Sequence, residues 1–106
     1  MPRYLMQANY TVEGLKGFLR EGGTKRRATV EQLVKGLGGK LEAFYYAFGD
    51  TDAFVIAEVP DAVTAAAVSM AVNASGAVVL KTTVLITPEE MDQATKKTVS
   101  YRPPGR

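Results

Sequence analysis

The chain has 106 residues, of which 46% are hydrophobic and 23% charged, and this composition is typical of a single soluble domain. It contains no histidine and no cysteine. These two absences exclude disulfides, thiolate nucleophiles, Ser/His/Asp triads and metal or haem sites with imidazole or thiolate ligands. We therefore expect no metal and no cofactor, and any chemistry must use carboxylate, phenol, amide, hydroxyl or amine groups.

The net charge of +2 comes from one end of the chain. Residues 96–106 contain four basic residues and no acid, which leaves nine basic against eleven acidic residues in the rest. The prolines of this stretch cannot continue a helix, and it has little apolar content. We predict a domain over 1–95 and a basic, flexible tail over 96–106. A solvated terminus is the favoured interpretation, with contact to nucleic acid or a neighbouring subunit as the alternatives.

The first third of the chain predicts one strand and a helix in two pieces. Residues 3–10 alternate around β-favouring side chains, and Thr11 is a suitable N-cap for the helical spacing that follows. Gly22 and Gly23 interrupt that spacing. Residues 24–37 then carry apolar positions at helical intervals before a pair of glycines, so they predict the second piece.

The rest of the chain predicts a hairpin, an alanine-rich helix capped by Asp61, a last strand and a short helix that begins at Thr87 with a capping box. The predicted strands and alanine-rich helix are 40–48, 53–59, 62–74 and 77–86. The order is therefore βαββαβ with a terminal helix. We predict an α+β fold in which a ferredoxin-like antiparallel sheet carries its helices on one face.

Alternation along the strands assigns side chains to the two faces of this sheet. The first face is apolar and suits the helices: Tyr4, Met6, Ala8, Leu41, Ala43, Tyr45, Ala47, Ala53, Val55, Ala57, Val59, Val78, Leu80, Thr82, Val84 and Ile86. The second face carries large apolar residues among charges: Phe44, Tyr46, Phe48, Phe54, Ile56 and Leu85. Apolar patches of this size mark a partner or a ligand. We predict a homodimer or higher homo-oligomer that pairs sheet against sheet, unless a helix or the tail folds over this face.

Polar side chains on the second face predict a ligand pocket between the facing sheets. Its members are Gln7, Asn9, Glu42, Phe44, Tyr46, Phe54 and Glu58. Such a mixture is typical of a site for a small apolar or aromatic molecule. In the alternative interpretation, Asn9 bonds local backbone and the other residues form cross-strand pairs.

An enzyme is the second functional hypothesis, most plausibly a cofactor-independent monooxygenase or isomerase. Asn9 would orient the substrate, and Tyr46 or Asp52 would transfer a proton. Nucleic acid is not expected as a partner, because acidic residues stand where RNA-binding modules of this topology carry basic and aromatic ones. No apolar run suits a leader or a membrane span, so we expect a cytoplasmic protein without membrane contact.

One basic cluster stands apart from these assignments. Lys25, Arg26 and Arg27 lie at a predicted helix start, where positive charge opposes the helix dipole. They can form a solvated turn, bind a phosphate or pair with acids of another subunit.

Several segments resemble the GYD family: Ala8-Asn9-Tyr10-Thr11 with Gly14, Leu37-Gly38-Gly39-Lys40, Phe44-Tyr45-Tyr46, Gly49-Asp50-Thr51-Asp52, Val55-Ile56 and Pro60-Asp61. The similarity extends over residues 2–91. It implies a dimeric α+β barrel built from ferredoxin-like units. Gly49 and Asp52 match the motif that names the family, whereas Thr51 stands in place of its tyrosine. The glycine and the aspartate are also ordinary hairpin residues.

Overall fold

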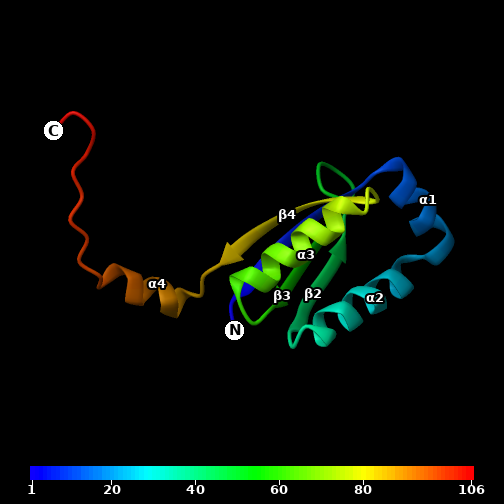
Figure 1. Cartoon of the computed structure of the whole chain (residues 1–106), viewed down its shortest axis with the longest axis horizontal. Helices are drawn as coiled ribbons and strands as arrows, with labels where there is room; N and C mark the ends of the chain where they lie inside the picture. Colours follow the sequence, from blue (N-terminus) through cyan, green and yellow to red (C-terminus); the bar gives the residue numbers. More distant parts are fainter.

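The computed structural model describes all 106 residues as an α+β fold with one four-stranded antiparallel sheet and four helices (Figure 1). The elements are β1 (Arg3–Tyr10), α1 (Val12–Glu21), α2 (Gly23–Gly36), β2 (Lys40–Tyr46), β3 (Ala53–Glu58), α3 (Ala62–Ala74), β4 (Val78–Leu85) and α4 (Pro88–Thr95). The strand order across the sheet is β2-β3-β1-β4. Each predicted element is present, and the bounds of β1 and α3 agree with the prediction.

The helix ends follow from the predicted caps. The Thr11 hydroxyl accepts a hydrogen bond from the Gly14 N–H and begins α1, while Gly22 at φ +83° separates α1 from α2. A side chain is disfavoured in that left-handed conformation, which explains the glycine. Asp61 caps α3 through the Thr64 N–H at 2.8 Å. Helix α4 has its complete capping box around Thr87.

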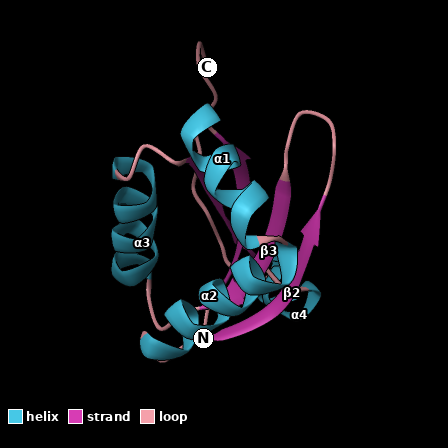
Figure 2. Cartoon of the chain, turned by 90° about the vertical axis from the view of Figure 1, so that its right-hand side faces the viewer, coloured by secondary structure: helices cyan, strands magenta, loops and turns pink.

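The core lies between the sheet and the helices on one of its faces. Helix α2 packs over β2, and α3 packs over β4. Figure 2 shows α2 and α3 on the same side of the sheet. Buried side chains of the sheet meet those of α2 and α3 in this layer: Tyr4, Met6, Ala8, Val34, Ala53, Val55, Ala57, Val59, Ala65 and Val78. The opposite face of the sheet has no helix over it, and we call it the open face.

A β-bulge in β2 overturns part of the predicted face assignment. Leu41 pairs with Ala57, but the next pair in the ladder is Ala43 with Ile56, so Glu42 is an extra residue. A register shift of one residue moves all following side chains to the other face. The strict alternation therefore holds only before the bulge.

Phe44 and Tyr46 consequently lie on the helix-covered face, and their prediction for the open face was wrong. Phe44 pairs with Val55 and packs against the core, while Tyr46 pairs with Ala53. Tyr45 lies on the open face instead, and 72% of its surface is exposed.

Two strands also end differently from the prediction. Strand β2 stops at Tyr46, and Phe48 lies fully exposed in the hairpin loop instead of on a sheet face. Val84 and Ile86 were expected in the core, but more than half of each is exposed. An eight-residue strand is about 26 Å long and a 13-residue helix only about 20 Å, so the end of β4 extends beyond α3.

The last part of the chain projects away from the sheet. Helix α4 and residues 96–106 extend to one side of the molecule in Figure 1. No residue of α4 is buried. None of the four helices has the length and apolar character required to cross a membrane.

Candidate ligand pocket and open face

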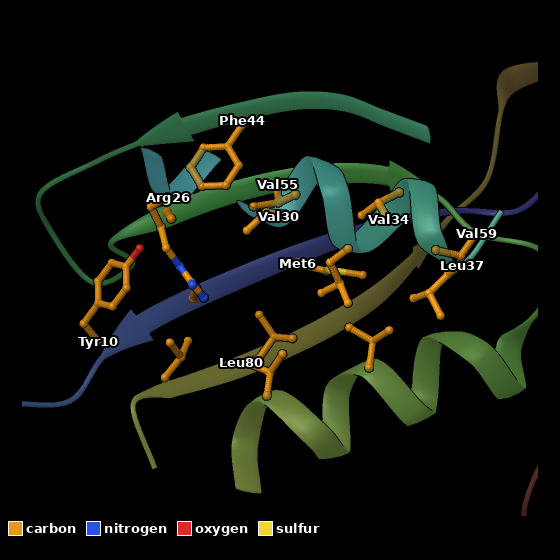
Figure 3. Close-up of a pocket in the computed structure, with 16 residues that line it drawn as sticks. Met6, Tyr10, Arg26, Val30, Val34, Leu37, Phe44, Val55, Val59 and Leu80 are labelled. Carbon is orange, nitrogen blue, oxygen red and sulfur yellow. The ribbon is translucent and has the colours of Figure 1, made fainter. Parts of the chain in front are cut away.

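An apolar pocket with a cavity volume of about 80 Å³, partly open to solvent, lies between the sheet and helices α2 and α3 (Figure 3). Fifteen of its sixteen lining residues are hydrophobic. They are Met6, Ala8, Tyr10, Val30, Leu33, Val34, Leu37, Phe44, Ala53, Val55, Val59, Val68, Val72, Val78 and Leu80, and the remaining residue is Arg26.

The pocket exists because the two helices stand apart over the sheet (Figure 2). Helix α2 directs Val30 and Val34 toward the sheet, and α3 directs Val68 and Val72 toward it. Sheet residues below are small at several positions, such as Ala8, so they do not fill the space between the helices. Aliphatic walls of this kind exclude water from the interior.

The pocket continues into a groove on the surface between α2 and α3. Leu33, Leu37, Val68 and Val72 line both the pocket and the groove, and Val63 belongs to the groove alone. The groove provides an apolar route from solvent into the pocket.

Arg26 and Tyr10 form the polar end of the pocket. In Figure 3 the Arg26 side chain lies beside the Tyr10 side chain. Both residues also line a second, more polar pocket on the surface, together with Glu13 and Glu21 of α1. Burial raises the pKa of the Tyr10 phenol, and the nearby Arg26 guanidinium lowers it by a smaller amount. Tyr10 is therefore a neutral hydrogen-bond donor at neutral pH.

A chain of aromatic rings connects this polar end with β2. The ring centroids of Tyr10 and Phe18 are 5.3 Å apart, those of Phe18 and Tyr46 are 5.2 Å apart, and those of Tyr46 and Phe44 are 5.1 Å apart. The Tyr46 hydroxyl donates to the Gly23 carbonyl at 2.8 Å. Partial burial raises the pKa of Tyr46, so its phenol is neutral at neutral pH and does not supply a phenolate base.

Asn9 and Asp52 hold the β2–β3 hairpin against the end of β1. The Asp52 N–H donates to the Asn9 side-chain oxygen at 3.0 Å, and the Asp52 carboxylate accepts from the Tyr10 N–H at 2.9 Å. Asn9 thus bonds the backbone of the hairpin, which is distant in sequence. The catalytic roles suggested for Asn9, Tyr46 and Asp52 stay predictions.

The other predicted pocket residues lie on the open face. Arg3 forms an ion pair there with Glu42 at 2.8 Å and a longer one with Glu58 at 3.7 Å. Gln7 pairs with Phe54 across β1 and β3. The structure therefore divides the predicted set between two faces, with Phe44 and Tyr46 on one and the remaining residues on the other. Gly49 lies in the exposed hairpin loop next to Asp50.

Sequence reasoning did not find the polar end of the helix-side pocket. In the sequence, Tyr10 is the last residue of a predicted strand and part of one segment that resembles the family, and Arg26 belongs to a basic cluster. The sequence carries one signal, because an arginine in the first turn of a helix opposes the helix dipole.

The architecture defines the class of protein, an α+β domain with an antiparallel sheet, helices over one face and an apolar pocket beneath them. The family model described as GYD domain matches residues 4–95. The chain therefore belongs to the GYD domain family, as the resemblance indicated. No curated protein and no solved structure matches the chain significantly.

Proposed function

We propose that the protein binds a small apolar molecule in the pocket between the sheet and helices α2 and α3. The observation that carries this proposal is the lining of the pocket, which has fifteen hydrophobic residues among sixteen. Small-molecule sites typically combine apolar walls with a few polar groups. The groove between α2 and α3 supplies the entrance.

Native mass spectrometry of freshly purified protein, followed by calorimetric titration with 1-decanol, tests this proposal. We expect a bound apolar molecule or measurable decanol binding. Val68→Phe places extra volume in the pocket and should abolish binding, whereas Met70→Phe on the exposed side of α3 should not. Absence of binding to the folded wild-type protein, or equal binding by both variants, would contradict the proposal.

We also propose that the open face pairs with a second copy of the chain. The strand order β2-β3-β1-β4 supports a ferredoxin-like unit, and family membership supports pairing of two such units into an α+β barrel. Large apolar side chains without a helix above them support this interface: Tyr45 and Val79 are 72% and 55% exposed, and Phe54 is 37% exposed. Gln7, Phe54 and Glu58 would then face the space between the two sheets.

Light scattering at micromolar concentration tests this pairing. The wild-type protein should have the mass of a dimer or of a larger assembly. Phe54→Asp should yield monomers, because it places a charge in an apolar interface. Phe48→Asp is the matched control, since Phe48 lies in the loop and is fully exposed. A wild-type monomer at these concentrations would refute the pairing.

A further inference from the structure

One charged group lies at the edge of an otherwise hydrophobic pocket. The Arg26 side chain is half-buried and is the only charged residue among those that line the pocket. A guanidinium always carries its charge, and a cation in apolar surroundings is costly unless an anion or several acceptors accompany it. The Arg26 guanidinium therefore requires an anion or several acceptors beside it.

No carboxylate of the chain forms an ion pair with Arg26. The two ion pairs of the structure both belong to Arg3, on the opposite face of the sheet. Glu13 and Glu21 line the neighbouring surface pocket, but neither lies within ion-pair distance of the Arg26 guanidinium. Arg26 therefore has donors available for an anion that comes from outside the chain.

Tyr10 adds a second donor at the same end. Its ring lines the pocket, and its side chain lies beside that of Arg26 (Figure 3). Because its phenol is neutral, it can donate to an anionic oxygen. A planar guanidinium and a phenol suit the two oxygens of a carboxylate.

The two ends of the pocket differ in a way that orients a ligand. The end toward the groove is aliphatic, with Leu33, Leu37, Val68 and Val72, whereas the other end carries Arg26. We propose that the ligand of this pocket is an amphipathic acid, whose apolar body lies between α2 and α3 and whose carboxylate binds Arg26. This inference rests on the proposed function and specifies its ligand class.

A comparison of decanoate with 1-decanol by calorimetry at pH 8 and below micellar concentrations tests the inference. The two probes share an apolar chain and differ in their head groups. The wild-type protein should bind decanoate about tenfold more tightly, because a charge-assisted hydrogen bond is stronger than a neutral one. Arg26→Gln should remove this preference, so that the variant binds decanoate and decanol with affinities within about twofold of each other.

Arg27→Gln is the matched control, because it removes the same charge from the adjacent, exposed position outside the pocket. It should keep the preference for decanoate. Equal affinity of the wild-type protein for the two probes would overturn the inference even if Arg26→Gln does not fold. An equal loss in both variants would overturn it as well, since it would indicate general attraction by the basic cluster. Failure to bind either probe would instead refute the proposed function.

Discussion

The Tyr46 hydroxyl donates a hydrogen bond to the backbone carbonyl of Gly23 and thereby joins the end of β2 to the first residue of α2. The contact is close, because a Cβ on Gly23 would lie 2.9 Å from a ring carbon of Tyr46. This relationship exists only because the bulge in β2 turns Tyr46 toward the helices. It also places the first turn of α2, which contains Arg26, beside the aromatic chain.

Tyr46→Phe should lower the free energy of unfolding by about 0.5–1.5 kcal/mol, the usual net contribution of one hydrogen bond. Chemical denaturation monitored by circular dichroism measures this change. Tyr45→Phe is the control, because Tyr45 lies on the open face and 72% of it is exposed. Equal effects of the two substitutions would mean that the Tyr46 hydroxyl does not stabilise the contact with α2.

Gly14→Ala should destabilise the protein by about 1–3 kcal/mol, the range seen when a packed site receives an extra group. A Cβ at Gly14 would overlap the carbonyl oxygen of Ala77, the residue just before β4. Gly17→Ala, one turn further along α1, should have the opposite sign. No atom lies within 4 Å of its Cβ position, and alanine favours a helix by up to about 1 kcal/mol over glycine. Thermal unfolding should show a lower melting temperature than the wild type for Gly14→Ala and a higher one for Gly17→Ala.

Asp52→Ala should cost about 1–3 kcal/mol of stability, because the part-buried Tyr10 N–H then loses its acceptor. Asp50→Ala in the same loop should be neutral, since Asp50 is exposed. Hydrogen exchange at the Tyr10 amide should accelerate only in the Asp52 variant. Unchanged exchange there would contradict the structural role assigned to Asp52.

Stability should decrease in acid partly because Asp61 becomes protonated. Its hydrogen bonds with Thr64 lower the pKa of Asp61 below the ordinary 3.8. The unfolded state then binds more protons than the folded state, so stability rises with pH. The contribution is complete above pH 3.8 and disappears as the pH falls through the lowered value. Asp61→Ser keeps a cap without titrating, so the melting temperature of this variant should fall less than that of the wild type between about pH 5 and about pH 2, a range that spans an ordinary carboxyl pKa.

Acid should also weaken a second element, helix α4, independently of the Asp61 cap. The capping box around Thr87 lowers the pKa of Glu90, so α4 should also weaken in acid. Helix α4 projects from the body and buries no residue, and its loss should therefore leave the melting temperature of the sheet unchanged. If Asp61→Ser retains the full acid dependence, then the Asp61 cap is not its cause.

Local features of the sequence predicted the secondary structure well. Helix caps and breaks depend on only a few neighbouring residues, so the local sequence is sufficient to predict them. This holds for the caps at Thr11, Asp61 and Thr87 and for the break at Gly22. Alternation also placed the residues of β1 and β3 on the right faces, because both strands are regular. The order of elements followed from these signals alone.

Tertiary structure decided where the pocket lies. The extra residue Glu42 shifts the ladder by one, and this moves Phe44 and Tyr46 from the open face to the helices. Nothing in the alternation of β2 marks the shift, because a bulge depends on pairing with the neighbouring strand. The spacing of α2 and α3 and the approach of Arg26 to Tyr10 likewise arise from packing between distant segments. The sequence by itself determined the order of the elements and the two faces of β1 and β3, whereas packing between distant segments determined the face of Phe44 and Tyr46 and placed the Arg26 guanidinium beside an apolar pocket.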